Sequence, residues 1–308
     1  MDAAIETSGL SKRFRKRIAV QPIDLTVPRG SLFGYLGPNG AGKTTTIRML
    51  LGLARPTAGN ARLLGKPVPR GLASVRTQVG SLLEDPAFYP RISGRRNLQI
   101  LARTAGDKTA FDRIDALLDR VGLLDRAGDR VRTYSHGMRQ RLGLAAALLH
   151  DPELIVLDEP ATALDPAGIR DVRAMLAALR DEGRTLFISS HLLSEVELIC
   201  DQVAVVSKGR MMYQGTLAGL TTGAGRVRIS IDDLDAADRV IRELGWTVVR
   251  EGDVLIVDGA PAREVNRALA ERGLYAHGIA EDARRLEDVF LELTEEPDAP
   301  PQPPEGEQ

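Results

Sequence analysis

Hydrophobic and polar positions alternate in short runs over the first part of the chain, and turn residues bound each run. Alternation over 18–27 and the apolar run at 31–36 predict β-strands, with a turn at 28–30 between them. A helix is expected from Lys43 to about Leu53, ended by the segment 55–59. Further short strands are predicted at 60–64 and 79–83.

From about residue 93 to residue 150, the hydrophobic period becomes that of amphipathic helices. Ile114, Leu117, Leu118 and Val121 fall on one face of such a helix. Strands then alternate with helices, which is the order of a mostly parallel sheet covered by helices. The predicted strands are 154–157, 184–189 and 202–207, and the predicted helices are 168–182 and 192–200.

A change of composition at 220–225, where the sequence reads LTTGAG, predicts a domain boundary. The segment beyond it is expected to form a small α+β module of about 75 residues, enough for its own core. Its predicted strands are 226–231, 246–250 and 254–257, and its predicted helices are 235–244 and 261–272. The Pro- and Glu-rich end is expected to be disordered. The expected parts are a first domain over 1–220 with a helical subdomain at about 93–150, an accessory module over 221–296, and a tail over 297–308.

The amino-acid composition excludes several classes of protein but does not indicate a particular reaction. The 308 residues are 43% hydrophobic and 27% charged, which excludes collagen-like, disordered and disulfide-rich chains. The net charge of −1 gives no broad attraction for nucleic acid, so no nucleic-acid partner is expected. The single cysteine, Cys200, fits a reducing compartment. No apolar run approaches the roughly 18 residues of a membrane span, and no signal-peptide pattern opens the chain, so a cytoplasmic location is expected.

A glycine-rich segment after the strand at 31–36 carries the clearest chemistry. It fits the pattern G-x-x-x-x-G-K-[ST], in which backbone N–H groups wrap around phosphates at a helix N-terminus. Lys43 would reach the β- and γ-phosphates and Thr44 would hold Mg²⁺. The alternative is a glycine-rich turn with a capping threonine. The residues of the pattern are Gly37, Pro38, Asn39, Gly40, Ala41, Gly42, Lys43 and Thr44.

Two acids follow the apolar strand at 154–157, where ligands bind in open α/β sheets. Asp158 can hold Mg²⁺, and Glu159 can polarise a water as a general base. Alone, the pair is equally a solvated strand end. The glycine-rich segment favours the functional interpretation of the two acids. His191 follows the next predicted strand and is either a helix cap, a core residue or a sensor of the γ-phosphate.

Together these motifs resemble the nucleotide-binding subunit of an ABC transporter over about residues 5–220. Further family motifs follow in order: a signature at 134–140, a D-loop at 163–166, and Phe14 at the position that stacks on adenine. The resemblance implies an α/β P-loop NTPase fold, with a RecA-like parallel-sheet core, an antiparallel β subdomain and an α-helical subdomain. It also implies two subunits facing head to tail, with two ATP molecules between them.

The resemblance implies roles for individual residues. The residues expected to act in catalysis are Glu159, His191 and Lys43. Those expected to bind ATP are Phe14, Gly37, Pro38, Asn39, Gly40, Ala41, Gly42, Lys43, Thr44, Thr45, Ser135, Gly137 and Asp165, and those expected to hold Mg²⁺ are Thr44, Asp158 and Glu84.

Two departures from the family pattern point to one of its branches. The signature reads Tyr-Ser-His-Gly-Met, so His136 replaces a glycine and Met138 a glutamine, while Ser135 and Gly137 remain. Glu84 stands where the family has the glutamine of the Q-loop. Both departures, and the C-terminal segment 286–294, resemble the drug- and antibiotic-export branch.

The sequence therefore predicts an ATPase that energises export of a drug, antibiotic or lipid-like compound. Its expected partners are a second nucleotide-binding subunit, in a homodimer, and a separate membrane permease that holds it on the inner face of the cell membrane. The alternatives are a mechanical ATPase of the same superfamily, acting on ribosomes or DNA, and a regulatory module that binds nucleotide without hydrolysis. Intact Lys43, Asp158, Glu159 and His191 argue against the regulatory module.

Overall fold

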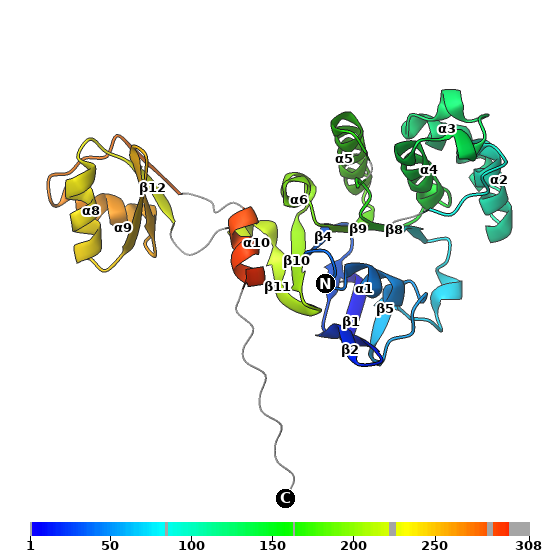
Figure 1. Cartoon of the computed structure of the whole chain (residues 1–308), viewed down its shortest axis with the longest axis horizontal. Coiled ribbons are helices and arrows are strands. Elements are labelled where there is room, and N and C mark those ends of the chain that lie inside the picture. The colour runs from blue at the N-terminus through cyan, green and yellow to red at the C-terminus, as the bar shows by residue number, and fades with distance from the viewer. Residues whose placement is uncertain (1, 84–85, 163, 222–225, 282–285, 296–308) are drawn as a thin grey trace, which may run out of the picture. The chain divides into compact units, whose positions relative to one another are not determined.

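Two compact units make up the chain, Met1–Gly215 and Thr216–Gln308 (Figure 1). The division between the units comes a few residues before the expected boundary at 220–225. Helix α7 (Leu217–Thr221) belongs to the second unit, where it contacts α10 (Leu286–Glu295). Glu84 and the expected tail at 297–308 lie outside the described residues. The computed structural model describes residues 2–83, 86–162, 164–221, 226–281 and 286–295.

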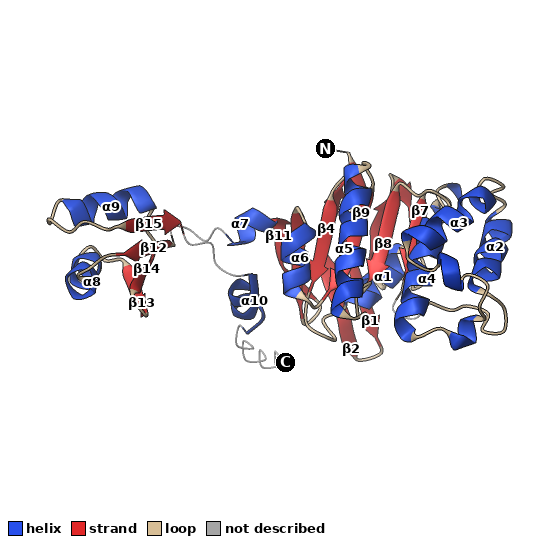
Figure 2. Ribbon diagram, turned by 90° about the horizontal axis from the view of Figure 1, so that it is seen from above, coloured by secondary structure: helices blue, strands red, loops and turns tan. Residues whose placement is uncertain are grey.

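A six-stranded sheet with the order β11-β10-β4-β9-β8-β7 forms the centre of the first unit (Figure 2). The strands from β10 to β7 run parallel to their neighbours, which confirms the predicted sheet. Every residue of β4, β8 and β9 is buried, as expected for strands covered on both faces. The strands are β4 (Leu32–Leu36), β7 (Val79–Leu82), β8 (Leu154–Asp158), β9 (Thr185–Ser190), β10 (Gln202–Ser207) and β11 (Arg210–Thr216).

Helices cover one face of this sheet, and a second sheet with one helix covers the other (Figure 1). Helices α4 (His136–Leu148), α5 (Pro166–Asp181) and α6 (Leu193–Ile199) contact β7, β9 and β4. On the opposite face, α1 (Lys43–Leu50) shares one hydrophobic core with the antiparallel strands. The helix that begins in the glycine-rich segment is thereby fixed between two sheets.

The antiparallel sheet is built around one long strand, β1, which the sequence suggested only as short pieces. Irregularities in its register let β1 pair with β2, β3 and β5 along its length. Phe14 ends this strand and pairs with Arg17 across the turn to β2. The strands are β1 (Ala3–Phe14), β2 (Arg17–Ile23), β3 (Thr26–Pro28), β5 (Ala58–Leu63) and β6 (Lys66–Pro67), and a short 3₁₀ helix η1 (Leu72–Ser74) follows.

Helices dominate the segment from residue 94 to residue 148, as the periodicity predicted. They are α2 (Gly94–Ala105), α3 (Ala110–Arg120) and α4, with short 3₁₀ helices η2 (Leu124–Arg126) and η3 (Val131–Thr133) between α3 and α4. Ser93 caps α2 by accepting a hydrogen bond from the Arg96 N–H. Over the part of the chain that the structure describes, no helix combines the length and apolar character needed to cross a bilayer.

Helix α1, strand β11 and one strand of the second unit also differ from the sequence-based expectation. Helix α1 ends at Leu50 rather than near Leu53, because Gly52 adopts a left-handed conformation with φ 70° and the Leu53 N–H returns to the Arg48 carbonyl. Strand β11 was not predicted, because it is a partly exposed edge strand without a clear alternation. Strand β15 (Gly278–Glu281) was missed for the same reason.

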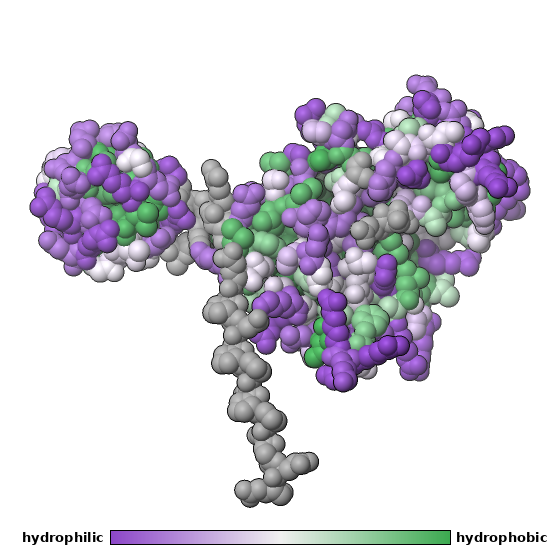
Figure 3. Space-filling view, in the orientation of Figure 1, coloured by the Kyte–Doolittle hydropathy of each residue, from purple (hydrophilic) through white to green (hydrophobic). Residues whose placement is uncertain are grey.

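The second unit contains a four-stranded antiparallel sheet with the order β13-β14-β12-β15. Together with helices α8 and α9, this sheet has the β-α-β-β-α-β order of ferredoxin-like modules. Its hydrophobic residues form a core of their own, and the face drawn in Figure 3 shows hydrophilic residues around a hydrophobic centre. The elements are β12 (Val227–Ser230), α8 (Leu234–Glu243), β13 (Thr247–Glu251), β14 (Val254–Asp258), α9 (Ala262–Ala270) and β15.

Gly80 of β7 packs tightly against the end of the helical segment. A Cβ at this position would lie 2.1 Å from the Ala147 carbonyl oxygen and 2.9 Å from Pro152 Cγ. We expect Gly80→Ala to lower the free energy of unfolding by about 1–3 kcal/mol, because backbone must move to admit the methyl group. Gly128→Ala is the matched control, since a Cβ there meets nothing within 4 Å. Equal urea midpoints for both variants would contradict this account of the packing.

Candidate functional site

The glycine-rich segment forms a tight loop between β4 and α1. Gly40 and Gly42 have φ of 82° and 102°, a region that favours glycine. A Cβ on Gly37 would lie 2.4 Å from the Val206 carbonyl oxygen, so this position also requires glycine. The Lys43 ammonium folds back over the loop and donates to the Gly37 carbonyl at 2.7 Å. The loop therefore places the N-terminus of α1 and the buried Lys43 ammonium on the same side of the sheet edge.

Strand β8 delivers Asp158 and Glu159 to the same edge of the sheet. Asp158 is fully buried and lies opposite Ser189 in the parallel register of β8 and β9. The Ser189 hydroxyl donates to Asp158 Oδ1 at 2.5 Å and accepts from the Glu159 N–H at 3.0 Å. Asp158 Oδ2 is buried and has no hydrogen-bond partner among the described residues. One carboxylate oxygen is therefore held, and the other is left for a ligand.

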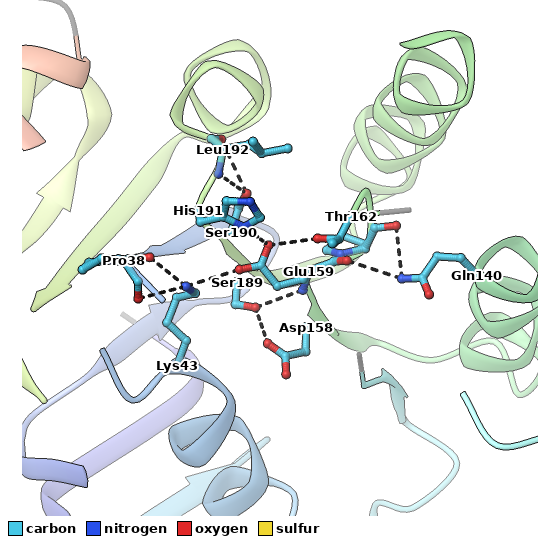
Figure 4. Close-up of polar contacts among 12 residues, drawn as sticks. Pro38, Lys43, Gln140, Asp158, Glu159, Thr162, Ser189, Ser190, His191 and Leu192 are labelled. Atoms are coloured by element: carbon cyan, nitrogen blue, oxygen red, sulfur yellow. Dashed lines mark hydrogen bonds and ion pairs between the residues drawn. The ribbon is translucent and has the colours of Figure 1, made fainter. Parts of the chain in front are cut away.

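Glu159 is the centre of a polar network (Figure 4). Its Oε1 lies 3.3 Å from Lys43 Nζ, and its Oε2 lies 2.7 Å from His191 Nδ1. The Thr162 hydroxyl donates to the same Oε2 at 3.3 Å. Glu159 itself has φ 52°, an unfavourable conformation for a residue with a side chain. The backbone is therefore strained at the residue whose carboxylate contacts Lys43.

These groups line an open cavity of about 730 Å³. Phe14 also lines this cavity and is 52% exposed. Lys12 Nζ stands 4.9 Å from the centre of the Phe14 ring and does not line the cavity. One ring face is thus covered by a cation. The lining residues are Phe14, Arg17, Ala19, Asn39, Gly40, Gly42, Lys43, Thr44, Thr45, Glu159, Thr162 and His191.

The signature and D-loop residues have a different position. Ser135 caps α4 by accepting from the Met138 N–H at 3.1 Å, and Gly137 lies in the first turn of that helix. Asp165 caps α5 by accepting from the Gly168 N–H at 2.8 Å. None of these three is among the described residues that line the cavity. The structure therefore brings Phe14, the glycine-rich loop, Glu159 and His191 together, and does not bring Ser135, Gly137 or Asp165 to them.

Sequence reasoning missed three residues that hold the site in shape. Ser189 and Thr162 contact the two acids directly. Gln140 is buried on α4, and its Nε2 donates to the carbonyls of Glu159 and Pro160 at 3.4 and 3.3 Å. Gln140 therefore links the signature helix to the turn after β8. The available signals were the strand end for Ser189, the position just before the D-loop for Thr162, and the signature for Gln140.

Cys200 takes no part in this chemistry. Burial raises the pKa of its thiol far above the ordinary value, so the thiol stays protonated.

Comparison with known proteins places the chain in a family. Residues 20–162 match the family described as ABC transporter. The chain is 45% identical over 298 residues to the uncharacterised ABC transporter ATP-binding protein YhcH of Bacillus subtilis (strain 168), covering 96% of this chain and 97% of that protein. It is 38% identical to the bacitracin transport ATP-binding protein BcrA of Enterococcus faecalis, and the similarity covers 95% of this chain and 97% of that protein. It is 37% identical to the daunorubicin/doxorubicin resistance ATP-binding protein DrrA of Streptomyces peucetius, and the similarity covers 96% of this chain and 93% of that protein.

Solved structures agree with this assignment. An ATP-binding subunit of an ABC transporter superposes with a TM-score of 0.65 at 25% identity, covering 87% of this chain and 99% of that one. The ADP conformation of MJ1267, an ATP-binding cassette of an ABC transporter, superposes with a TM-score of 0.63 at 20% identity and covers 70% of this chain and 92% of that one. This second structure supports the fold. The P-loop NTPase fold expected from the sequence is thereby confirmed. The chain belongs to the family of ABC transporter ATP-binding proteins, whose cassette binds and hydrolyses ATP.

Proposed function

We propose that this chain is the ATP-hydrolysing subunit of an ABC exporter that moves a drug, an antibiotic or a lipid-like compound through a separate membrane permease. The observation that carries the proposal is that one cavity is lined by Phe14, Lys43, Glu159 and His191. The similarity to bacitracin and daunorubicin resistance subunits extends over more than nine-tenths of both chains, and so includes the second unit.

ATP enters this cavity with its base at Phe14 and its phosphates at the glycine-rich loop. Lys12 covers one face of the Phe14 ring, which leaves the face toward the cavity for adenine. The N–H groups at the start of α1 and the Lys43 ammonium attract the phosphates. Thr44 and Thr45 line the cavity beside Lys43 and contribute hydroxyl groups.

The residues around Asp158 fit a magnesium ion. Asp158 Oδ2 is buried and has no partner among the described residues, and Thr44, the residue after Lys43, is one of the residues that line the cavity. No group of three or more His, Cys, Asp or Glu side chains forms a metal cage in the described part of the chain. This fits Mg²⁺, which takes one or two protein oxygens and completes its shell with phosphates and water. When bound, the ion supplies positive charge to the β- and γ-phosphates.

Glu159 acts as the base that orients and polarises the attacking water. Its carboxylate faces the cavity, and its contacts with Lys43, His191 and Thr162 hold it in one orientation. In-line attack on the γ-phosphate needs such a positioned acceptor together with charge neutralisation by Lys43. His191 positions the γ-phosphate, since its ring also lines the cavity.

A second copy of the chain completes the site. Ser135 and Gly137 at the start of α4 are away from the cavity of their own chain, although a helix N-terminus is suited to a phosphate. A head-to-tail homodimer brings this helix start, and Asp165 of the D-loop, to the ATP held by the other copy. Loss of the γ-phosphate then weakens the dimer, and the permease transmits that change across the membrane. The subunit would lie at the cytoplasmic face of the membrane.

The test is a pull-down of tagged Glu159→Gln protein from membranes of its native host with ATP present. We expect a protein with several membrane spans to be recovered in near-stoichiometric amount, because the variant keeps ATP and the dimer. The Lys66→Met variant, altered at an exposed position outside the cavity, serves as a control for solubility and tag accessibility. Recovery of ribosomes or DNA instead would favour a mechanical ATPase, and recovery of no partner would favour a regulatory module.

A further inference from the structure

One cation in the cavity wall has no role in the site described so far. Arg17 begins β2, is exposed, and lines the cavity together with its cross-strand partner Phe14. Resting on the proposed function, we propose that Arg17 is a further nucleotide-binding residue whose guanidinium contacts the phosphate nearest the ribose.

The Arg17 guanidinium is available for such a contact. Within the described residues, it makes no hydrogen bond and no ion pair. Lys43, the other cation of the wall, is engaged by the Gly37 carbonyl and by Glu159. Arg17 is therefore the cation of this wall that a ligand can engage without breaking an existing contact.

The register of β2 places Arg17 between the base and the loop that binds phosphate. Arg17 and Ala19 are alternate residues of one strand, and both line the cavity. Ala19 touches the loop, since a Cβ on Gly42 would lie 2.6 Å from its carbonyl oxygen. Two residues of strand place Arg17 about 7 Å further along, beside Phe14. With adenine against Phe14, this position faces the ribose and the first phosphate.

The chemistry favours the phosphate over the ribose. A guanidinium carries a fixed charge and presents several N–H donors in one plane, which suits the oxygens of a phosphate. A contact to the first phosphate is shared by AMP, ADP and ATP, and is absent from adenosine. The proposal therefore predicts which ligands lose affinity when Arg17 is changed.

The competing explanation is a general attraction by the basic turn, the exposed residues Arg13, Arg15 and Lys16 around the turn between β1 and β2. Lys16 provides the matched control, because it is the neighbouring exposed cation and does not line the cavity. Diffuse attraction would be lost to a similar degree in Lys16→Ala and Arg17→Ala. A direct contact would be lost only in Arg17→Ala, and Arg17→Lys would recover part of it.

The experiment measures binding to the purified chain without Mg²⁺, so that hydrolysis does not intervene. Titration calorimetry gives the affinities of ADP and ATP, and competition against ATP gives those of AMP and adenosine. We expect Arg17→Ala to weaken ATP, ADP and AMP by about tenfold or more, a loss typical of one charged hydrogen bond, and to leave adenosine unchanged. Lys16→Ala should stay within about twofold of the parent protein.

Each other outcome has a defined meaning. Equal losses in Lys16→Ala and Arg17→Ala, unchanged ADP affinity in Arg17→Ala, or an equal loss for adenosine would overturn the role given to Arg17. If the unaltered chain binds neither ATP nor ADP, the proposed function fails, and that result is separate. Thermal unfolding of each variant checks that the exposed substitution leaves the fold intact.

Discussion

Replacing Glu159 with glutamine is expected to lower the rate of ATP turnover by about 10²–10⁴-fold, the usual contribution of a positioned general base. Glutamine keeps the size of the side chain and a hydrogen-bonding oxygen, but it cannot accept a proton from water. The carboxylate now contacts Lys43 at 3.3 Å and His191 at 2.7 Å, so the change acts at the centre of the network. Binding of ATP should persist, because removing this negative charge does not weaken the attraction for phosphate.

Release of phosphate by the purified variant with Mg²⁺ and ATP measures this effect, and size-exclusion chromatography with ATP measures the dimer. Glu197→Gln is the control, since Glu197 is an exposed acid on α6 and does not line the cavity. The expected pattern is a dimer that accumulates with ATP in Glu159→Gln and normal turnover in Glu197→Gln. Turnover within a few-fold of the parent protein would exclude the role of Glu159 as the base.

The parts of the site that lie within one short segment could be predicted from the sequence. The glycine-rich loop needs its glycines for local reasons, shown by the φ of Gly42 and by the close approach of Gly37 to Val206. The two acids follow a run of apolar residues, which identifies a buried strand and its end. In each case the residue type and its neighbours in the chain determine the position.

The parts that depend on register between distant strands could not be predicted. Ser189 meets Asp158 because β8 and β9 pair in one particular register, and no local pattern encodes that register. Arg17 faces the cavity because β2 packs beside the loop at Gly42, while its sequence neighbours in the basic turn do not line the cavity. The same limit applies to β15, whose place at the edge of the described sheet depends on its pairing with β12.

Replacing Lys43 with methionine is expected to weaken ATP binding by at least about 30-fold, which corresponds to about 2 kcal/mol. The Lys43 side chain is 6% exposed, and its ammonium lies within 3.3 Å of Glu159. Methionine fills a similar volume but removes the charge that faces the phosphates. It also leaves the Glu159 carboxylate, which is 12% exposed, without this cation and with its negative charge toward the cavity. Lost attraction and new repulsion therefore act together.

A double-variant cycle separates these two contributions. If repulsion by Glu159 accounts for part of the loss, Glu159→Gln should strengthen ATP binding more in the Lys43→Met background than in the parent protein. Titration calorimetry without Mg²⁺ gives the four affinities, and thermal unfolding checks that each variant is folded. Strictly additive changes would mean that the Lys43–Glu159 contact has no energetic bearing on ATP binding. A larger gain in the Lys43→Met background would mean that Lys43 neutralises the Glu159 carboxylate in the parent protein, so that the methionine variant loses attraction for phosphate and gains repulsion together.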